Sequence, residues 1–215
     1  MNTELFSLFS ATFVTFFVLI DAVGVAPVFA TMTAPGGPKY ARRMAIKSVI
    51  VATIIVFAFA IGGAWLLDKM HISIAAFRAA GGALLFLIAL DMVFEKRTER
   101  RENRAESHLS EEHEPQEDIS VFPLGIPMLA GPGTIATAML YMGNAEGNYL
   151  EQGVVLASLG LNMALVLMIF LLAGPIIRFM GESVAGALTR ILGVILAALS
   201  VQLLIDGIKG AFGLG

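Results

Sequence analysis

The chain of 215 residues contains no cysteine and only three histidines. Without cysteine it can form no disulfide, no thiolate nucleophile and no cysteine-ligated metal centre. The net charge of −3 indicates no particular partner, and the lack of a basic stripe argues against nucleic-acid binding. No His–carboxylate–Ser set, metal motif or phosphate loop can be assembled from the residues present. We therefore expect neither an enzyme nor a cofactor.

Apolar residues are abundant: they make up 57% of the chain, and the mean hydropathy is +0.83. Soluble domains are about half apolar, so the excess predicts contact with a lipid bilayer. Apolar runs cover residues 5–33, 44–67, 72–94, 121–142, 152–173 and 187–208. All but the first and fourth have the length of a simple spanning helix, about 20 residues. The first run lacks a positively charged leader and is interpreted as a span, not a cleavable signal. The sequence thus predicts an all-α polytopic membrane protein with six transmembrane helices.

The first and fourth runs are not expected to be regular helices. The first is too long for one straight crossing and contains Asp21, Gly24 and Pro27. The fourth mixes proline with glycine, at Pro123, Gly125, Pro127, Gly131, Pro132 and Gly133. Proline removes a backbone donor and clashes with the preceding turn. Irregular backbone survives in lipid only where it is buried in protein or lines a wet cavity. We therefore expect both segments to be broken beside such a cavity.

The two halves of the chain resemble each other. Arg78 and Arg190 lie 112 residues apart, and each is followed three residues later by a glycine at the start of a long apolar stretch. Each half also begins with a segment interrupted by proline and glycine. Because three spans per half force the second copy to be inverted, we predict a 3+3 inverted repeat: residues 1–94, a charged cytoplasmic linker at 95–120, and residues 121–215. Inverted repeats with broken helices are typical of secondary transporters.

The distribution of positive charge predicts the orientation. Eleven of the 14 Lys and Arg residues fall in three loops on one side: Lys39, Arg42, Arg43, Lys47, Lys96, Arg97, Arg100, Arg101, Arg104, Arg178 and Arg190. By the positive-inside rule these loops are cytoplasmic, so we expect an inner (plasma) membrane protein with both termini on the periplasmic or extracellular side. In the linker, a metal ion could bind a set of His and Glu residues: Glu106, His108, Glu111, Glu112 and His113. A solvated charge run is the simpler interpretation, because nothing fixes ligand geometry there.

Asp21 is the most informative single residue. It lies about 16 residues into the first run and therefore deep in the membrane, where an ionised carboxylate is costly unless it is paired or hydrated. It could hold a cation, a substrate ammonium group or a transported proton. Alternatively, it caps a helix that starts before Gly24 and Pro27.

The second candidate is the run Gly131-Pro132-Gly133-Thr134, which reads as a break followed by a new helix with Thr134 as N-cap or first-turn hydroxyl. A helix N-terminus beside a cavity offers free N–H groups to a carboxylate. The alternative is a structural kink. In the fifth run, Asn162 could hydrogen-bond a substrate, although an interhelical bond is an equal alternative.

These motifs resemble those of the MarC family of integral membrane proteins, which includes the SnatA-like transporters of small neutral amino acids. The similar stretches are residues 21–29, 78–85, 123–134 and 190–208. Many relatives have proline directly after the polar residue of the first run, where this chain has Ala22. The resemblance implies six inner-membrane spans, a distant relationship to lysine-exporter-type carriers and transport of glycine or alanine. It also implies that the cavity-lining residues are Asp21, Gly24, Pro27, Gly125, Pro127, Gly131, Gly133 and Thr134.

The leading hypothesis is therefore an ion- or proton-coupled secondary transporter, with a small-molecule substrate bound between the first and fourth segments. The alternatives are a carrier for a lipid-linked substrate and a non-transporting membrane scaffold. A solvated cavity at the membrane midplane favours the amino-acid carrier, a lateral groove open to lipid favours the lipid carrier, and a dry interior favours the scaffold.

Overall fold

Every regular element that the structure describes is a helix. The computed structural model describes residues 2–94 and 118–214. Its elements are α1 (Asn2–Ile20), α2 (Ala22–Thr33), η1 (Ala34–Gly36), α3 (Gly37–Lys69), α4 (Ile74–Val93), η2 (Ser120–Leu129), α6 (Pro132–Asn144), α7 (Tyr149–Leu171) and α8 (Ala173–Phe212). The predicted all-α class is confirmed for this part of the chain. The candidate metal ligands around His108 and His113 lie outside the described residues.

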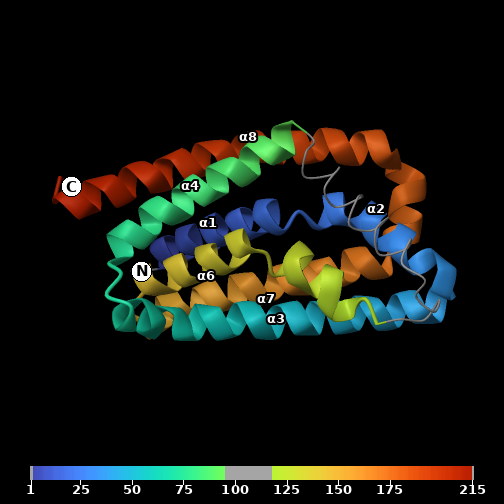
Figure 1. The fold of residues 1–215 in the computed structure, drawn as a ribbon, viewed down its shortest axis with the longest axis horizontal. Helices are drawn as coiled ribbons and strands as arrows, with labels where there is room; N and C mark the ends of the chain where they lie inside the picture. The colour runs from blue at the N-terminus through green and yellow to red at the C-terminus, as the bar shows by residue number, and fades with distance from the viewer. Residues whose placement is uncertain (1, 95–117, 215) are drawn as a thin grey trace.

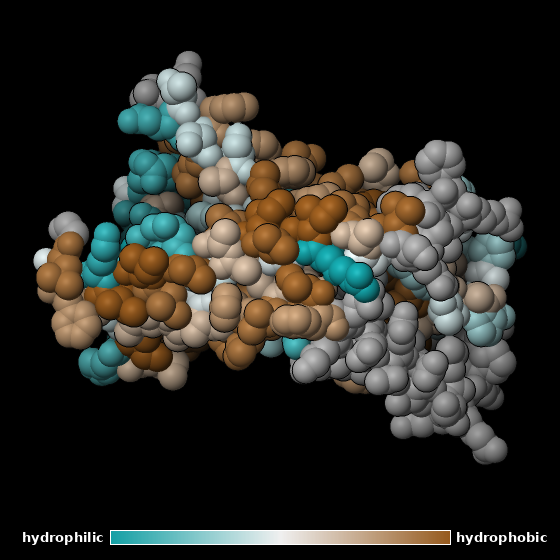
Figure 2. Space-filling model, turned by 90° about the horizontal axis from the view of Figure 1, so that it is seen from above, coloured by the Kyte–Doolittle hydropathy of each residue, from teal (hydrophilic) through white to brown (hydrophobic). Residues whose placement is uncertain are grey.

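The described helices have the length and surface of membrane spans. Four stretches are long and apolar enough to cross a bilayer, or five if the bent pair η2–α6 counts as one span; the first, Thr3–Lys69, contains α1, α2 and α3. Large apolar side chains are exposed along α3, at Ile50, Ile54, Ile61 and Trp65. Figure 2 shows apolar side chains over much of one face, with polar ones gathered near one end and one polar side chain close to the middle. This exterior fits lipid, and the chain is a polytopic membrane protein.

Helices α4 and α8 form an antiparallel pair along one side of the molecule, and the remaining helices form the other layer (Figure 1). Gly82 of α4 approaches Leu204, whereas Gly193 of α8 approaches Met92. A Cβ atom on Gly82 would lie 2.7 Å from the backbone nitrogen of Leu204, so the two backbones are in close contact. Both chain ends lie at the same end of the molecule as the α3–α4 and α6–α7 turns (Figure 1).

The buried apolar side chains form two clusters that match these layers. The larger joins α1, α2, α3, η2, α6 and α7, with Ala173 at the start of α8, and in it Phe29 stacks on Phe170 with ring centroids 4.3 Å apart. The smaller joins α4 and α8 to the end of α1. The end of α1 contributes to both, through Ile20 in the larger cluster and Leu19 in the smaller. The two layers therefore meet where the first segment is broken.

Two helices extend beyond the apolar runs that predicted them. Helix α3 starts at Gly37 with Pro38 in its first turn, so Lys39, Arg42 and Lys47, which we expected in a loop, are helical. Helix α8 starts at Ala173, before the last apolar run. Hydropathy marks only the part of a helix that lies in lipid, whereas Lys and Arg are good helix formers and continue the helix outside it.

Candidate functional site

The break in the first segment lies at Asp21. Helix α1 ends at Ile20 and α2 begins at Ala22, and Asp21 between them has left-handed backbone angles, φ 53° and ψ 53°. Aspartate is one of the few residues besides glycine that adopt this conformation, because its short side chain can hydrogen-bond locally. Here its Oδ1 accepts a hydrogen bond from the backbone N–H of Gly24 at 3.2 Å. The capping role, one of the two alternatives for Asp21, is thus confirmed.

Gly24 and Pro27 lie inside α2 and not at the break that we expected them to form. Helix α2 extends from Ala22 to Thr33, with Pro27 in its second turn. The left-handed residue at position 21 already interrupts the hydrogen-bond ladder. The missing N–H of Pro27 then removes only one further bond within a helix that continues past it.

Thr189 of α8 joins Asp21 to the other layer. Its hydroxyl donates a hydrogen bond to the Asp21 carboxylate, with distances of 3.3 and 3.4 Å to the two oxygens. Asp21 is 1% and Thr189 3% exposed. A Cβ atom on Gly24 would overlap the Asp21 carboxylate and come within 2.6 Å of Thr189 Oγ1, so only glycine fits there. Thr189 directly precedes the repeated Arg190 motif, but no pattern in the sequence pairs it with Asp21.

The second break separates η2 from α6, and the two are bent by 57°. Within η2, Phe122 and Ile126 are extended, as residues before proline tend to be, and both are joined to their prolines by cis peptide bonds. Helix α6 then starts with Gly131 as an extended N-cap and Pro132 in the first position. The prediction of a broken fourth segment is confirmed.

The start of α6 presents backbone donors inside the protein. The first intrahelical hydrogen bond is donated by Ile135 to the Gly131 carbonyl, at 3.1 Å. The N–H groups of Gly133 and Thr134 precede it and have no partner within the helix by position. Thr134 is buried, and it lies in the first turn, whereas Gly131 is the N-cap. Such a helix start is suited to a negatively charged group.

The two breaks are close neighbours. A Cβ atom on Gly133 would lie 3.2 Å from Leu19 Cδ1, and Leu19 is only two residues before Asp21. The same position is 3.3 Å from Leu85 Cδ2 and 2.7 Å from Ile88 Cδ1, both of α4. Gly133 therefore lies where α1, α4 and α6 meet. The structure thus brings Asp21, Gly24 and Gly133 to the interface between the two layers, and Thr134 directly follows Gly133 in α6.

Gly125, Pro127 and Gly131 shape η2. A Cβ atom on Gly125 would lie 2.7 Å from the Ser120 carbonyl oxygen and 3.1 Å from Val51 Cγ1, so this glycine allows η2 to pack on α3. A Cβ atom on Gly131 would lie 2.9 Å from the carbonyl oxygen of Pro127. These contacts give Gly125 and Gly131 a role in the path of the backbone up to the start of α6.

Asn162 of α7 lies apart from the breaks. Its Nδ2 donates hydrogen bonds to the Phe13 carbonyl at 3.2 Å and to the Ser158 carbonyl at 3.0 Å. Phe13 is eight residues before Asp21, which corresponds to about 12 Å along α1. The interhelical bond, one of the two alternatives for Asn162, is therefore what the structure contains.

Polar side chains are buried between α1, α6 and α7. The Thr15 hydroxyl of α1 forms a hydrogen bond with the Tyr141 hydroxyl of α6, with 3.0 Å between the two oxygens. The hydroxyls of Thr137 and Ser158 are buried without a hydrogen-bond partner among residues 2–94 and 118–214. A buried polar atom without a hydrogen-bond partner is rare. A hydroxyl of this kind in apolar surroundings can bind water or a ligand. The interior of this layer thus contains polar groups as well as apolar ones.

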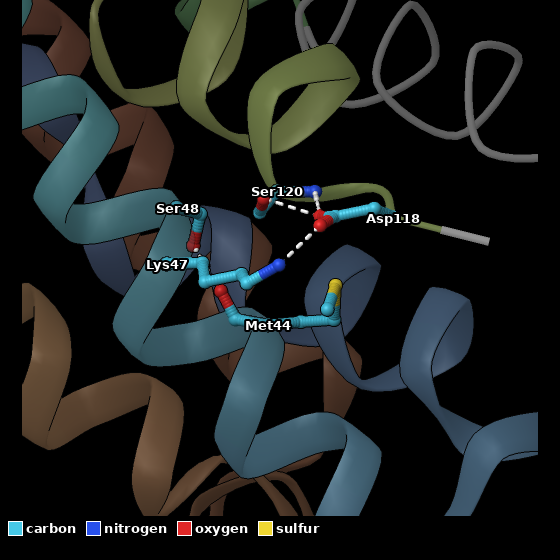
Figure 3. Close-up of polar contacts among 5 residues, drawn as sticks. All are labelled: Met44, Lys47, Ser48, Asp118 and Ser120. Carbon is cyan, nitrogen blue, oxygen red and sulfur yellow. Dashed lines mark hydrogen bonds and ion pairs between the residues drawn. The ribbon is translucent and has the colours of Figure 1, made fainter. Parts of the chain in front are cut away.

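A polar cluster joins the start of η2 to α3 (Figure 3). Asp118 forms an ion pair with Lys47 of α3 and accepts hydrogen bonds from the backbone and hydroxyl of Ser120. The Lys47 ammonium and then the Ser120 hydroxyl hold the pKa of Asp118 at about 2. Asp118 falls within the predicted linker 95–120, and the structure places its exposed carboxylate against Lys47 of α3.

A second polar contact lies between α4 and α6, where Arg78 Nη2 donates a hydrogen bond to Asn144 Oδ1. Asn144 is the last residue of α6 and Arg78 lies in the second turn of α4. No group of three His, Asp or Glu side chains that could hold a metal ion occurs in the described part of the chain.

Comparison with known proteins identifies the family. The family model described as "MarC family integral membrane protein" matches residues 6–212. A UPF0056 membrane protein of Methanocaldococcus jannaschii is 36% identical over 205 residues, which cover 94% of this chain and 97% of that protein. The UPF0056 membrane protein YvbG of Bacillus subtilis is 32% identical over 97% of each chain. No solved structure matches. With a match that extends from α1 to the end of α8, and with relatives of the same length and character, this chain belongs to the MarC family of integral membrane proteins.

Proposed function

We propose that the protein is an ion- or proton-coupled secondary transporter of small neutral amino acids such as glycine and alanine. The observation that carries this proposal is the meeting of two helix breaks inside the bundle, with Leu19 beside Asp21 on one side and Gly133 on the other. Broken helices whose ends face each other at the interface of two repeats are the usual substrate sites of secondary transporters.

The helix boundaries support an inverted repeat. At the spacing of 112 residues that separates Arg78 from Arg190, the start of α3 at Gly37 corresponds to the start of α7 at Tyr149. The start of α4 at Ile74 corresponds to Gly186, one residue before the last apolar run of the sequence at 187–208. In this proposal residues 1–94 and 121–215 each cross the membrane three times, in opposite orientations, and residues 95–120 link them.

Charge supports an orientation. Lys39, Arg42 and Arg43 are exposed in the first turns of α3, at the end of the molecule opposite to the chain termini (Figure 1). By the positive-inside rule that end is cytoplasmic and both termini are periplasmic, in an inner membrane.

The chemistry of the two breaks suits a zwitterion. The free N–H groups of Gly133 and Thr134 bind a carboxylate, and the α6 dipole favours its negative charge. The buried carboxylate of Asp21 takes the ammonium group or the coupling ion. Leu19, Leu85 and Ile88 surround the α6 start, so only a small side chain is accommodated between them.

The test is uptake of labelled glycine and alanine by proteoliposomes that contain the purified protein, with imposed proton and sodium gradients. We expect uptake by the parent and a loss of about tenfold or more in Asp21→Asn and Thr134→Val, because the first removes the charge that takes the ammonium group or the ion and the second removes the buried hydroxyl beside the free N–H groups of the α6 start. The matched control is Thr31→Val, an exposed threonine of α2, which should transport like the parent. Parent-like uptake by both site variants would place the substrate elsewhere. The absence of uptake of either amino acid by the parent would favour the lipid carrier or the scaffold.

A further inference from the structure

The α4–α8 pair is built as one unit. At Gly207 a Cβ atom would lie 2.8 Å from Ala79 Cα and 2.9 Å from the Ala75 carbonyl oxygen. At Gly193 it would lie 2.8 Å from Met92 Cβ. Contacts between one backbone and another cannot adapt by a change of rotamer, so sliding of α4 along α8 is sterically opposed.

The contacts between this pair and the other layer are of a different kind. At the start of α6 they are made by the ends of flexible side chains, Leu85 and Ile88 against Gly133. At the start of α2 they include the hydrogen bond from Thr189 to Asp21, at 3.3 Å. Side-chain ends can change rotamer and long hydrogen bonds are easily exchanged, so this interface can rearrange at a lower cost.

The other layer has its own connections. The Lys47–Asp118 ion pair joins α3 to η2, the Asn162 amide joins α7 to α1, and Phe29 stacks on Phe170 between α2 and α7. These contacts hold the two broken segments and their neighbours together independently of α4 and α8.

We propose that α4 and α8 move as a rigid pair against the layer of broken helices, and that this movement opens both breaks to substrate. This inference rests on the proposed function, because the movement is inferred to give a transported substrate access to its site. In the conformation described, Leu85 and Ile88 lie against Gly133 at the start of α6, and the Thr189 hydroxyl lies against the Asp21 carboxylate. A substrate reaches the α6 start only when the two α4 side chains withdraw. Helix α4 lies against the break before α6, and helix α8 lies against the break at Asp21. Because the two helices form one pair, a single displacement changes access to both breaks.

The natural lack of cysteine allows a direct test by cross-linking. For a lock within the pair we choose Ala75→Cys with Gly210→Cys, since a Cβ atom on Gly210 would lie 3.4 Å from Ala75 Cβ, close to disulfide geometry. To cross-link the two layers, α4 to α6, we choose Ile74→Cys with Gly143→Cys, joined by a short bifunctional methanethiosulfonate reagent. A Cβ atom on Gly143 would lie 3.9 Å from Ile74 Cγ1.

We expect the α4–α8 disulfide to leave alanine uptake within about twofold of the reduced protein, and the α4–α6 bridge to lower it by about tenfold until reductant is added. Loss of uptake with the α4–α8 disulfide, or unchanged uptake with the α4–α6 bridge, would overturn the proposal.

A second measurement does not depend on transport. Spin labels on exposed positions of the protein in lipid report distances by pulsed electron resonance. The pair Leu87→Cys with Ile191→Cys lies within α4–α8, and the pair Leu87→Cys with Ile54→Cys connects α4 to α3. We expect a distance distribution with one maximum for the first pair and with two maxima for the second. One maximum for both overturns the rigid-pair movement. Two maxima for the second pair, in a protein that takes up neither amino acid, would retain the movement and reject the proposed function.

Discussion

Thr189 of α8 donates a hydrogen bond to the carboxylate of Asp21, a residue 168 positions earlier in the chain. The bond connects the left-handed break of the first segment to the last helix, and both partners are buried. In the conformation described, the cap and this bond together orient the Asp21 carboxylate, as a binding group inside a membrane requires.

Thr189→Val should therefore weaken the folded state. It removes the donor and keeps the shape of the side chain, and we expect a loss of about 0.5–1.5 kcal/mol, the range of interhelical hydrogen bonds in membranes. The measurement is the free energy of unfolding by SDS titration in mixed micelles. Thr31→Val, at an exposed position of α2, should change it little. An equal loss in both variants would contradict the role assigned to Thr189.

Gly24→Ala should be more damaging, because the added Cβ atom would meet both Asp21 and Thr189 Oγ1. We expect a loss of about 1–3 kcal/mol from overpacking. Gly153→Ala is the control: nothing lies within 4 Å of its Cβ position, and alanine in an exposed helix should be neutral or stabilising by up to about 1 kcal/mol. Thr189→Ala should partly rescue Gly24→Ala, and a strictly additive double variant would count against this steric account.

The Lys47–Asp118 ion pair should make stability depend on pH. The pKa of Asp118 in the folded protein is about 2, below the value of about 3.9 for an unperturbed aspartate. A lowered pKa stabilises the folded state above the unfolded value, and this stabilisation disappears as the pH falls from about 4 to about 2.

The difference in thermal midpoint between the parent and Asp118→Asn should therefore be present at pH 6 and shrink towards pH 2. It should be small, because the two side chains are 39% and 47% exposed and exposed pairs contribute about 0–1 kcal/mol. Asp68→Asn, at the exposed end of α3, serves as the control. A difference that grows on acidification would have the wrong sign for this ion pair.

Asn162→Ala should affect folding and not substrate recognition. The variant loses the bonds to the carbonyls of Phe13 and Ser158, and we expect a loss of about 0.5–2 kcal/mol in the free energy of unfolding. The affinity for alanine should stay within about twofold of the parent by equilibrium binding. A variant of unchanged stability that binds alanine about tenfold more weakly would restore Asn162 to the substrate site.

The sequence predicted what depends on local chemistry. Proline and glycine between Pro123 and Gly133 identified the break before α6, and Asp21 was recognised as a possible cap, because both effects act within a few residues. The pairing of Thr189 with Asp21 could not be predicted, since it depends on how α8 packs against the first segment. The ion pair of Lys47 with Asp118 was missed for the same reason: the charge pattern indicated a loop and a solvated linker, whereas packing brings the two together.

The proposed site requires that a small amino acid reaches the start of α6. In the otherwise cysteine-free chain, Thr134→Cys should react with a water-soluble maleimide, and saturating alanine or glycine should slow the reaction by about tenfold, while leucine and lysine should not. A cysteine at position 134 that never reacts, or one that reacts equally fast with and without alanine or glycine, would contradict the proposed site.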